Sequence, residues 1–87
     1  MENKHYDNLT RLTKCRSIDD IVARAKFIGE QLERELRQEY RSLGNIAYYV
    51  ADMYNAMDML CIHFDMEEET QTIAEGLARG AIYHRCE

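Results

Sequence analysis

Residues 45–65, NIAYYVADMYNAMDMLCIHFD, decide how this chain folds. The segment holds fifteen apolar or tyrosyl residues and no Lys or Arg. Read as a helix, it places apolar side chains at alternating spacings of four and three, at Ile46, Val50, Met53, Met57, Leu60 and Phe64. A second line, Tyr49, Ala56 and His63, widens the apolar surface to roughly 220° of the circumference, well beyond the single stripe of a surface helix. One neighbouring helix is therefore not enough to cover it.

The composition predicts an all-α protein with a single domain over residues 1–87. Proline is absent, glycine occurs four times, and Ala, Leu, Met, Glu, Gln and Arg, which favour helices, are plentiful. Hydrophobic residues make up 46% and charged residues 31% of the chain, as in folded proteins. A chain this short buries only about 60–65% of the surface that its unfolded form exposes, so its own core is marginal.

The segment before residue 45 predicts a long helix over residues 18–43. Ser17 and Asp20 have the spacing of a capping box at its start. Apolar residues then recur at the helical period, at Ile18, Ile21, Val22, Ala25, Ile28, Leu32, Leu36, Tyr40 and Leu43. Gly44 is expected to cap the end of this helix and Asn45 to begin the next, over residues 46–64. A connection this short predicts a long antiparallel helical hairpin.

The apolar phase changes near residues 64–66, which predicts a third helix over residues 66–83. Met66, Thr70, Ile73, Leu77 and Ala81 do not continue the register of the preceding helix. Glu67, Glu68 and Glu69 suit the positive N-terminus of a new helix. Tyr6, Leu9 and Leu12 favour a short additional helix at about residues 6–14. The expected architecture is a small helical bundle that is completed as a dimer.

The apolar segment is a poor membrane span, and the chain is predicted to be cytoplasmic. Asp52, Asn55, Asp58 and His63 interrupt the segment, and a central Asp costs about 2.5–3.5 kcal/mol in a bilayer. The first residues, MENKHYDN, are polar and do not resemble a secretory signal. Three cysteines, an odd number, suit a reducing compartment better than a disulfide framework.

The negative charge is confined to one part of the chain. Residues 1–41 hold nine Lys and Arg against eight Asp and Glu, whereas residues 42–78 hold seven acids and no Lys or Arg. Solvated surfaces usually mix the two signs, so a block of one sign indicates an interaction surface. Since tyrosines are enriched at binding surfaces, we predict that a basic partner binds through Tyr and acidic residues. These are Tyr48, Asp52, Tyr54, Asn55, Asp58, Glu67, Glu68 and Glu69.

A second set of residues is predicted to mediate self-association. Its members are the surplus apolar side chains of the two helices after residue 45. They are Tyr49, Met53, Met57, Leu60, Ile73, Leu77 and Ile82.

Other motifs do not indicate a catalytic or metal site. Cys61 and His63 lie two residues apart, so on a helix they point to nearly opposite faces and do not readily share a zinc ion. The acidic surroundings of Cys61 disfavour a thiolate nucleophile, which needs positive charge nearby. The segment EGLARGA lacks the lysine of a phosphate-binding loop. The sequence therefore predicts no catalytic residue, no metal and no cofactor.

One pattern leaves an enzymatic alternative open. Glu30 and Glu33 lie one turn apart, and Asp52 follows in YVAD on the next helix. This pattern resembles the all-α nucleoside-triphosphate pyrophosphohydrolases, which hold Mg²⁺ with E-x-x-E on one helix and E-x-x-D on the next. The resemblance implies a magnesium-dependent hydrolase, with carboxylate oxygens as ligands. Tyr49 stands where that family has its first acid of the second helix.

The sequence favours a small acidic protein-protein interaction module, of the inhibitor, immunity, antitoxin or phage anti-defence type. Two kinds of basic partner fit: a nucleic-acid-binding protein, whose positive groove the acids would occupy, and another protein whose basic surface the acids would cap. The alternative is a homodimeric structural or adaptor module whose acidity serves solubility. Direct binding to nucleic acid is disfavoured, because the basic-free segment repels phosphate.

Overall fold

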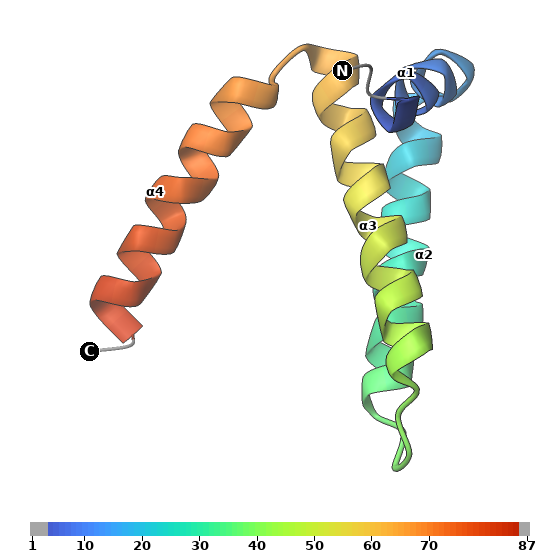
Figure 1. The fold of residues 1–87 in the computed structure, drawn as a ribbon, viewed down its shortest axis with the longest axis vertical. Helices are drawn as coiled ribbons and strands as arrows, with labels where there is room; N and C mark the ends of the chain where they lie inside the picture. The colour runs from blue at the N-terminus through green and yellow to red at the C-terminus, as the bar shows by residue number, and fades with distance from the viewer. Residues whose placement is uncertain (1–3, 86–87) are drawn as a thin grey trace.

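The computed structural model describes residues 4–85, with side chains described through residue 81. Four helices account for nearly all of this range: α1 (Lys4–Cys15), α2 (Ile18–Leu36), α3 (Leu43–Phe64) and α4 (Glu67–Arg85) (Figure 1). No strand occurs between residues 4 and 85. The predicted all-α class is confirmed.

The start of α2 is fixed by a capping box. The Asp20 N–H donates to Ser17 Oγ at 3.1 Å, and the Ser17 N–H donates to Asp20 Oδ2 at 3.4 Å. Each of these bonds satisfies a backbone group that the first turn of a helix leaves unpaired. A cap of this kind stabilises a helix by about 1 kcal/mol.

The end of α2 differs from the prediction. The helix stops at Leu36 with Arg37 as its cap, and residues 37–42 form the connection to α3. The Arg41 Nε donates to the Leu36 carbonyl oxygen at 2.8 Å, which turns the chain back after the last helical residue. Tyr40 and Leu43, which continue the apolar period, are 87% and 81% exposed. Periodicity alone therefore overestimates α2.

The start of α3 is set by Ser42, and the predicted roles of Gly44 and Asn45 as caps are wrong. The Asn45 N–H donates to Ser42 Oγ at 3.2 Å, so α3 begins at Leu43 and contains Gly44. The Glu35 carboxylate reinforces this turn. It accepts the Ser42 N–H and the Asn45 Nδ2 amide, each at 3.0 Å.

The connection between α3 and α4 is a tight elbow of two residues. Asp65 takes the left-handed conformation, with φ 52° and ψ 49°. The Met66 N–H donates to the Cys61 carbonyl at 3.0 Å, and the Asp65 N–H donates to the Ile62 carbonyl at 3.3 Å. These two bonds form a Schellman motif, which ends a helix and directs the chain that follows.

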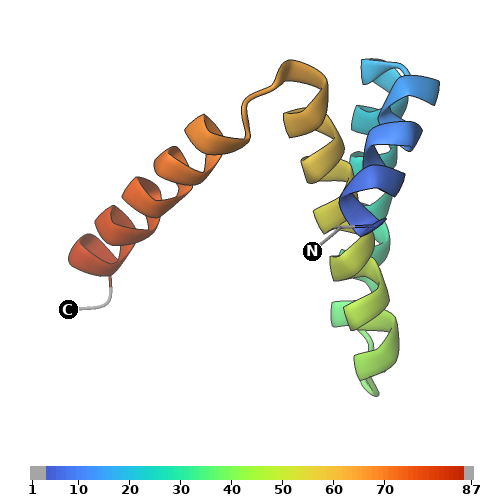
Figure 2. The same ribbon diagram turned by 45° about the horizontal axis from the view of Figure 1, so that its top comes forward.

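The hydrophobic core lies where α1, α2 and α3 meet. α2 and α3 lie side by side along most of their length, and α1 packs across α3 near one end of this pair (Figures 1 and 2). Leu9, Ile21, Ala56 and Met59 form the buried cluster, and Ile28 is also almost fully buried. We refer to these three helices as the three-helix unit.

α4 extends away from the three-helix unit. It contacts α3 near the elbow and touches neither α1 nor α2 (Figure 1). The radius of gyration is 15.4 Å, whereas a compact domain of this length has about 12 Å. The accessible surface is 7353 Å², whereas a folded monomer of 10.3 kDa exposes about 5,400 Å². The chain thus leaves roughly 2,000 Å² more surface in solvent than a compact monomer of its mass.

Candidate functional site

α3 carries an apolar stripe on a side that α1 and α2 leave largely open. Its residues recur at spacings of four and three, which places them on one face of a helix. Tyr54 is 67% exposed, Met57 41% and Phe64 53%, whereas Val50 is half-buried. We define the α3 stripe as Val50, Tyr54, Met57, Cys61 and Phe64.

α4 carries a matching apolar stripe. Ile73 is 61% exposed and Leu77 70% exposed, although both are large aliphatic side chains. We define the α4 stripe as Met66, Thr70, Ile73, Leu77 and Ala81, which again recur at helical spacing. No residue of α4 through position 81 is fully buried.

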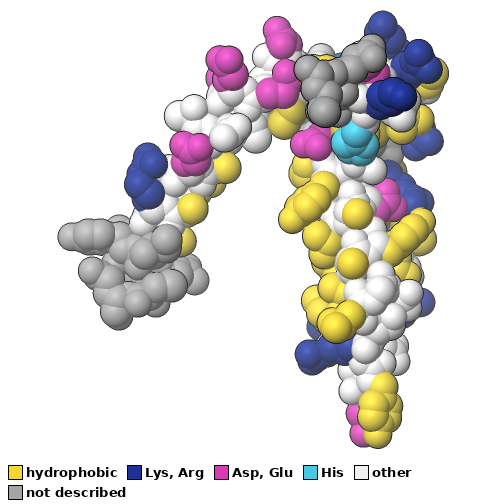
Figure 3. Space-filling view, viewed as in Figure 1, with side chains coloured by type: hydrophobic (Ala, Val, Ile, Leu, Met, Phe, Trp, Pro, Cys, Tyr) yellow, Lys and Arg dark blue, Asp and Glu magenta, His cyan; other side chains and the backbone are white. Residues whose placement is uncertain are grey.

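The two stripes meet at the elbow and then diverge. The buried Cys61 thiol donates to the Thr70 hydroxyl, with Sγ and Oγ1 3.5 Å apart. Because Cys61 belongs to the α3 stripe and Thr70 to the α4 stripe, this contact turns the two stripes toward each other. Figure 3 shows apolar side chains on the edge of the three-helix unit that faces α4 and on the edge of α4 that faces back.

The residues predicted for self-association divide into two groups. Tyr49, Met53 and Leu60 are half-buried on the side of α3 that packs within the three-helix unit. Leu60 packs against the core cluster, and a Cβ built on Gly29 of α2 would lie 3.7 Å from Met53 Cε. Met57, Ile73 and Leu77 are exposed instead. Ile82 lies in α4, but its side chain is outside the described range.

Some of the residues predicted to bind a basic partner form contacts within the chain. Asp52 Oδ2 accepts a charged hydrogen bond from Arg24 Nη2 at 2.6 Å. The same guanidinium lies 5.5 Å from the centroid of the Phe27 ring. Tyr48 is 63% exposed and stacks edge-to-face on Tyr49, with ring centroids 5.6 Å apart. The negative strip expected along α3 is therefore neutralised at Asp52.

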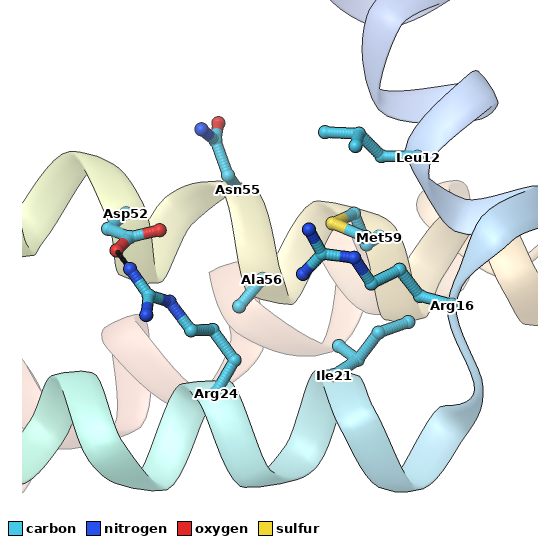
Figure 4. A pocket seen from close by; sticks show the side chains of 8 residues that line it. All are labelled: Leu12, Arg16, Ile21, Arg24, Asp52, Asn55, Ala56 and Met59. Atoms are coloured by element: carbon cyan, nitrogen blue, oxygen red, sulfur yellow. Dashed lines mark hydrogen bonds and ion pairs between the residues drawn. The ribbon is translucent and has the colours of Figure 1, made fainter.

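A shallow groove of about 330 Å³ runs beside this ion pair (Figure 4). Its apolar wall is formed by Leu12, Ile21, Ala56 and Met59, and its polar rim by Arg16, Arg24, Asp52 and Asn55. The Arg16 side chain, in the link between α1 and α2, has no hydrogen-bond or ion-pair partner among the side chains of residues 4–81. The sequence does not reveal this groove, because the groove depends on how α2 and α3 are rotated against each other.

The acids near the elbow form a second polar feature. Asp65, Glu67, Glu68 and Glu69 surround a hollow of about 340 Å³, and all four are exposed. Glu67 also lines a smaller groove of about 200 Å³ with Asp58 and residues of α1. Among the side chains described, residues 4–81, none of these five carboxylates forms an ion pair with a Lys or Arg. The predicted acidic residues are thus free of cations near the elbow, though not at Asp52.

The carboxylates of the pyrophosphohydrolase-like pattern do not form a cluster. Glu33 accepts a bond from Arg37 at 3.3 Å, and Asp52 pairs with Arg24. Among the described side chains, no three His, Cys, Asp or Glu residues are close enough to share a metal ion. Cys15 is exposed and Cys61 buried, and both are free thiols. The side chain of Cys86 lies outside the described range.

Comparison with protein-family models, curated protein sequences and solved structures finds no match to this chain. None of the helices in the described range has both the length and the apolar content needed to cross a bilayer. The function is therefore inferred from the geometry of the two stripes, the groove and the elbow.

Proposed function

We propose that this protein is a non-catalytic protein-protein interaction module that acts as a homodimer in the cytoplasm. In this proposal the hairpin formed by α2 and α3 is the scaffold, and α3 and α4 supply the dimer contact. The main support for this proposal is that Ile73 and Leu77 are exposed on a helix that lies apart from the core. Large contiguous apolar surfaces on folded proteins mark interaction sites.

The extended shape leaves surface available for such a contact. Burial of apolar surface favours association, whereas the loss of translational and rotational freedom opposes it by about 4–15 kcal/mol. Part of the roughly 2,000 Å² excess on each chain can be buried between two copies.

A charge placed in the α4 stripe tests the homodimer. Leu77→Glu buries an unpaired carboxylate at the contact and should weaken dimerisation by about 2–4 kcal/mol, or roughly 30-fold to 1,000-fold. Ala78→Glu adds the same charge to the same helix about 100° away from Leu77 and serves as the matched control. Sedimentation equilibrium measures both. If Leu77→Glu dimerises as tightly as Ala78→Glu, the α4 stripe is not part of the contact. The homodimer proposal itself fails if the unaltered chain sediments as a monomer.

A second role, binding of a basic partner, is supported by the unpaired acids of the elbow. Asp65, Glu67, Glu68 and Glu69 concentrate negative charge without a neighbouring cation in the described range. Such a surface steers a positively charged protein into contact and selects against acidic ones. This is the arrangement expected of an inhibitor, immunity, antitoxin or anti-defence protein that blocks a nucleic-acid-binding surface.

The elbow acids are the better target for charge reversal, because Asp52 is paired with Arg24. Glu68→Lys combined with Glu69→Lys should abolish capture of basic proteins from the native host. Glu30→Lys, on the exposed side of α2, is the control and should capture the same proteins as the unaltered chain. Capture of the same basic proteins by the double variant would show that the elbow is not the binding surface.

A further inference from the structure

We infer that dimerisation occurs by reciprocal docking of the α4 arm, so that the α4 stripe of each copy packs on the α3 stripe of the other. The occupant of each apolar face is thus a second copy of this chain. This inference rests on the proposed homodimer and specifies which surfaces form it.

The first support is that the elbow holds α4 away from its own α3. The Schellman bonds from Met66 to Cys61 and from Asp65 to Ile62 fix the direction in which the chain leaves α3. The contact between Cys61 and Thr70 holds the first turn of α4 in the same orientation. With two residues in the link, folding α4 flat against its own α3 would break these contacts. A second copy covers both stripes and leaves the elbow as it is.

The second support is that the two stripes are chemically matched. Neither stripe contains a charged residue, so their contact buries no unpaired ion. Glu75 lies about 180° around α4 from the centre of the α4 stripe, so its carboxylate remains in water when the stripe is covered. Tyr54 and Met57 on one side and Ile73 and Leu77 on the other are the most exposed large side chains in the middle of each stripe.

The third support is the size of the surface. If each copy recovers its excess of roughly 2,000 Å², the pair buries about 4,000 Å². Obligate homodimers bury about 2,000–5,000 Å², whereas weak or transient contacts bury less than about 1,200 Å². The arrangement is reciprocal, because each copy offers one α3 stripe and one α4 stripe. A twofold axis therefore satisfies both contacts at once and closes the assembly at two copies.

Isotope-filtered nuclear Overhauser spectroscopy on the full chain tests this docking directly. Equal amounts of ¹³C-labelled and unlabelled protein are mixed, unfolded and refolded together. Half of the dimers then contain one copy of each. We expect intermolecular cross-peaks from the Ile73 and Leu77 methyl groups to the Tyr54 ring and the Met57 methyl group. Contacts within the core cluster of Leu9, Ile21, Ala56 and Met59 are the internal control and should be intramolecular only.

Variants sharpen the same experiment. Leu77→Glu should lose the cross-peaks to Tyr54, and Ala78→Glu should retain them. A dimer whose intermolecular cross-peaks exclude α4 would overturn arm docking and leave the homodimer proposal standing. A chain that sediments as a monomer, with intramolecular contacts between Leu77 and Tyr54, would overturn both.

Discussion

At the scale of single residues, the ion pair between Arg24 and Asp52 is the main electrostatic contact between α2 and α3. It joins residues 28 positions apart, and its side chains are 43% and 24% exposed. Partial exposure screens the attraction, so the pair stabilises the fold by about 0.5–1 kcal/mol. A double-mutant cycle with Arg24→Gln and Asp52→Asn should give a coupling energy of that size from urea unfolding.

The pair between Glu33 and Arg37 is the matched control for this cycle. The Arg37 side chain is 77% exposed and that of Glu33 66%, and the two residues lie one turn apart at the C-terminal end of α2. Pairs of this kind contribute a few tenths of a kcal/mol. Equal coupling energies for the two pairs would contradict the inter-helix role of Arg24.

Glu35 makes the turn between α2 and α3 sensitive to acid. The Ser42 N–H and, to a smaller extent, the Asn45 amide lower the pKa of Glu35 below its ordinary value, against the opposing effect of desolvation. A carboxyl whose pKa is lowered by folding contributes its full stabilisation at pH values above the ordinary glutamate pKa. The stabilisation is lost as the pH falls through the lowered pKa. Acidification should therefore shrink the difference in unfolding free energy between the unaltered chain and Glu35→Gln.

Glu39→Gln is the control for this pH dependence. Glu39 is exposed in the same connection, and its carboxylate has no hydrogen bond or ion pair in the described range. Its removal should leave the acid limb of the stability curve unchanged. The unfolding free energies of the unaltered chain and Glu35→Gln could instead differ by the same amount from neutral pH to about pH 3. That result would show that the Ser42 bond does not stabilise the turn.

The residue-level features differ in how far the sequence reveals them. The capping box of Ser17 and Asp20 is local, so its spacing of three is enough to identify it. The bond between Arg24 and Asp52 depends on the rotation of one helix against another, which periodicity does not specify. For the same reason the sequence assigned Asp52 to a free negative surface.

At the scale of helices, the sequence places the elements better than their ends. The four segments expected from apolar period and phase correspond to α1, α2, α3 and α4. α2 nevertheless ends at Leu36, because the bonds of Arg41, Ser42 and Glu35 turn the chain before the apolar period stops. These side-chain bonds compete with helix continuation and leave no trace in the hydrophobic pattern.

The packing of α2 on α3 also leaves room for a stabilising substitution. Gly29 lies in the interior of α2, and a Cβ added there would meet Met53 Cε at 3.7 Å, an ordinary contact with a flexible side chain. Gly29→Ala should raise the free energy of unfolding by about 0.5–1 kcal/mol, since glycine loses more backbone entropy on helix formation. Guanidinium unfolding measures the change. If Gly29→Ala instead lowers the free energy of unfolding, α2 and α3 pack too closely at this position to accept a methyl group.

At the scale of the whole molecule, the sequence predicts a surplus of apolar surface but not its arrangement. The apolar breadth of residues 45–65 indicates that one neighbouring helix is insufficient, and α3 does contact three others. The direction of α4 is set by the left-handed Asp65 and the bonds around it, which the sequence did not indicate. The exposed stripe therefore includes Tyr54 and Phe64, whereas Tyr49 and Leu60 are half-buried.

In the proposed homodimer, a second copy of this chain covers the apolar surface that one copy leaves exposed. Sedimentation equilibrium at micromolar concentration tests this through the molar mass of the unaltered protein. We expect twice the chain mass of 10.3 kDa. A single species of 10.3 kDa that keeps its full helical content would contradict it.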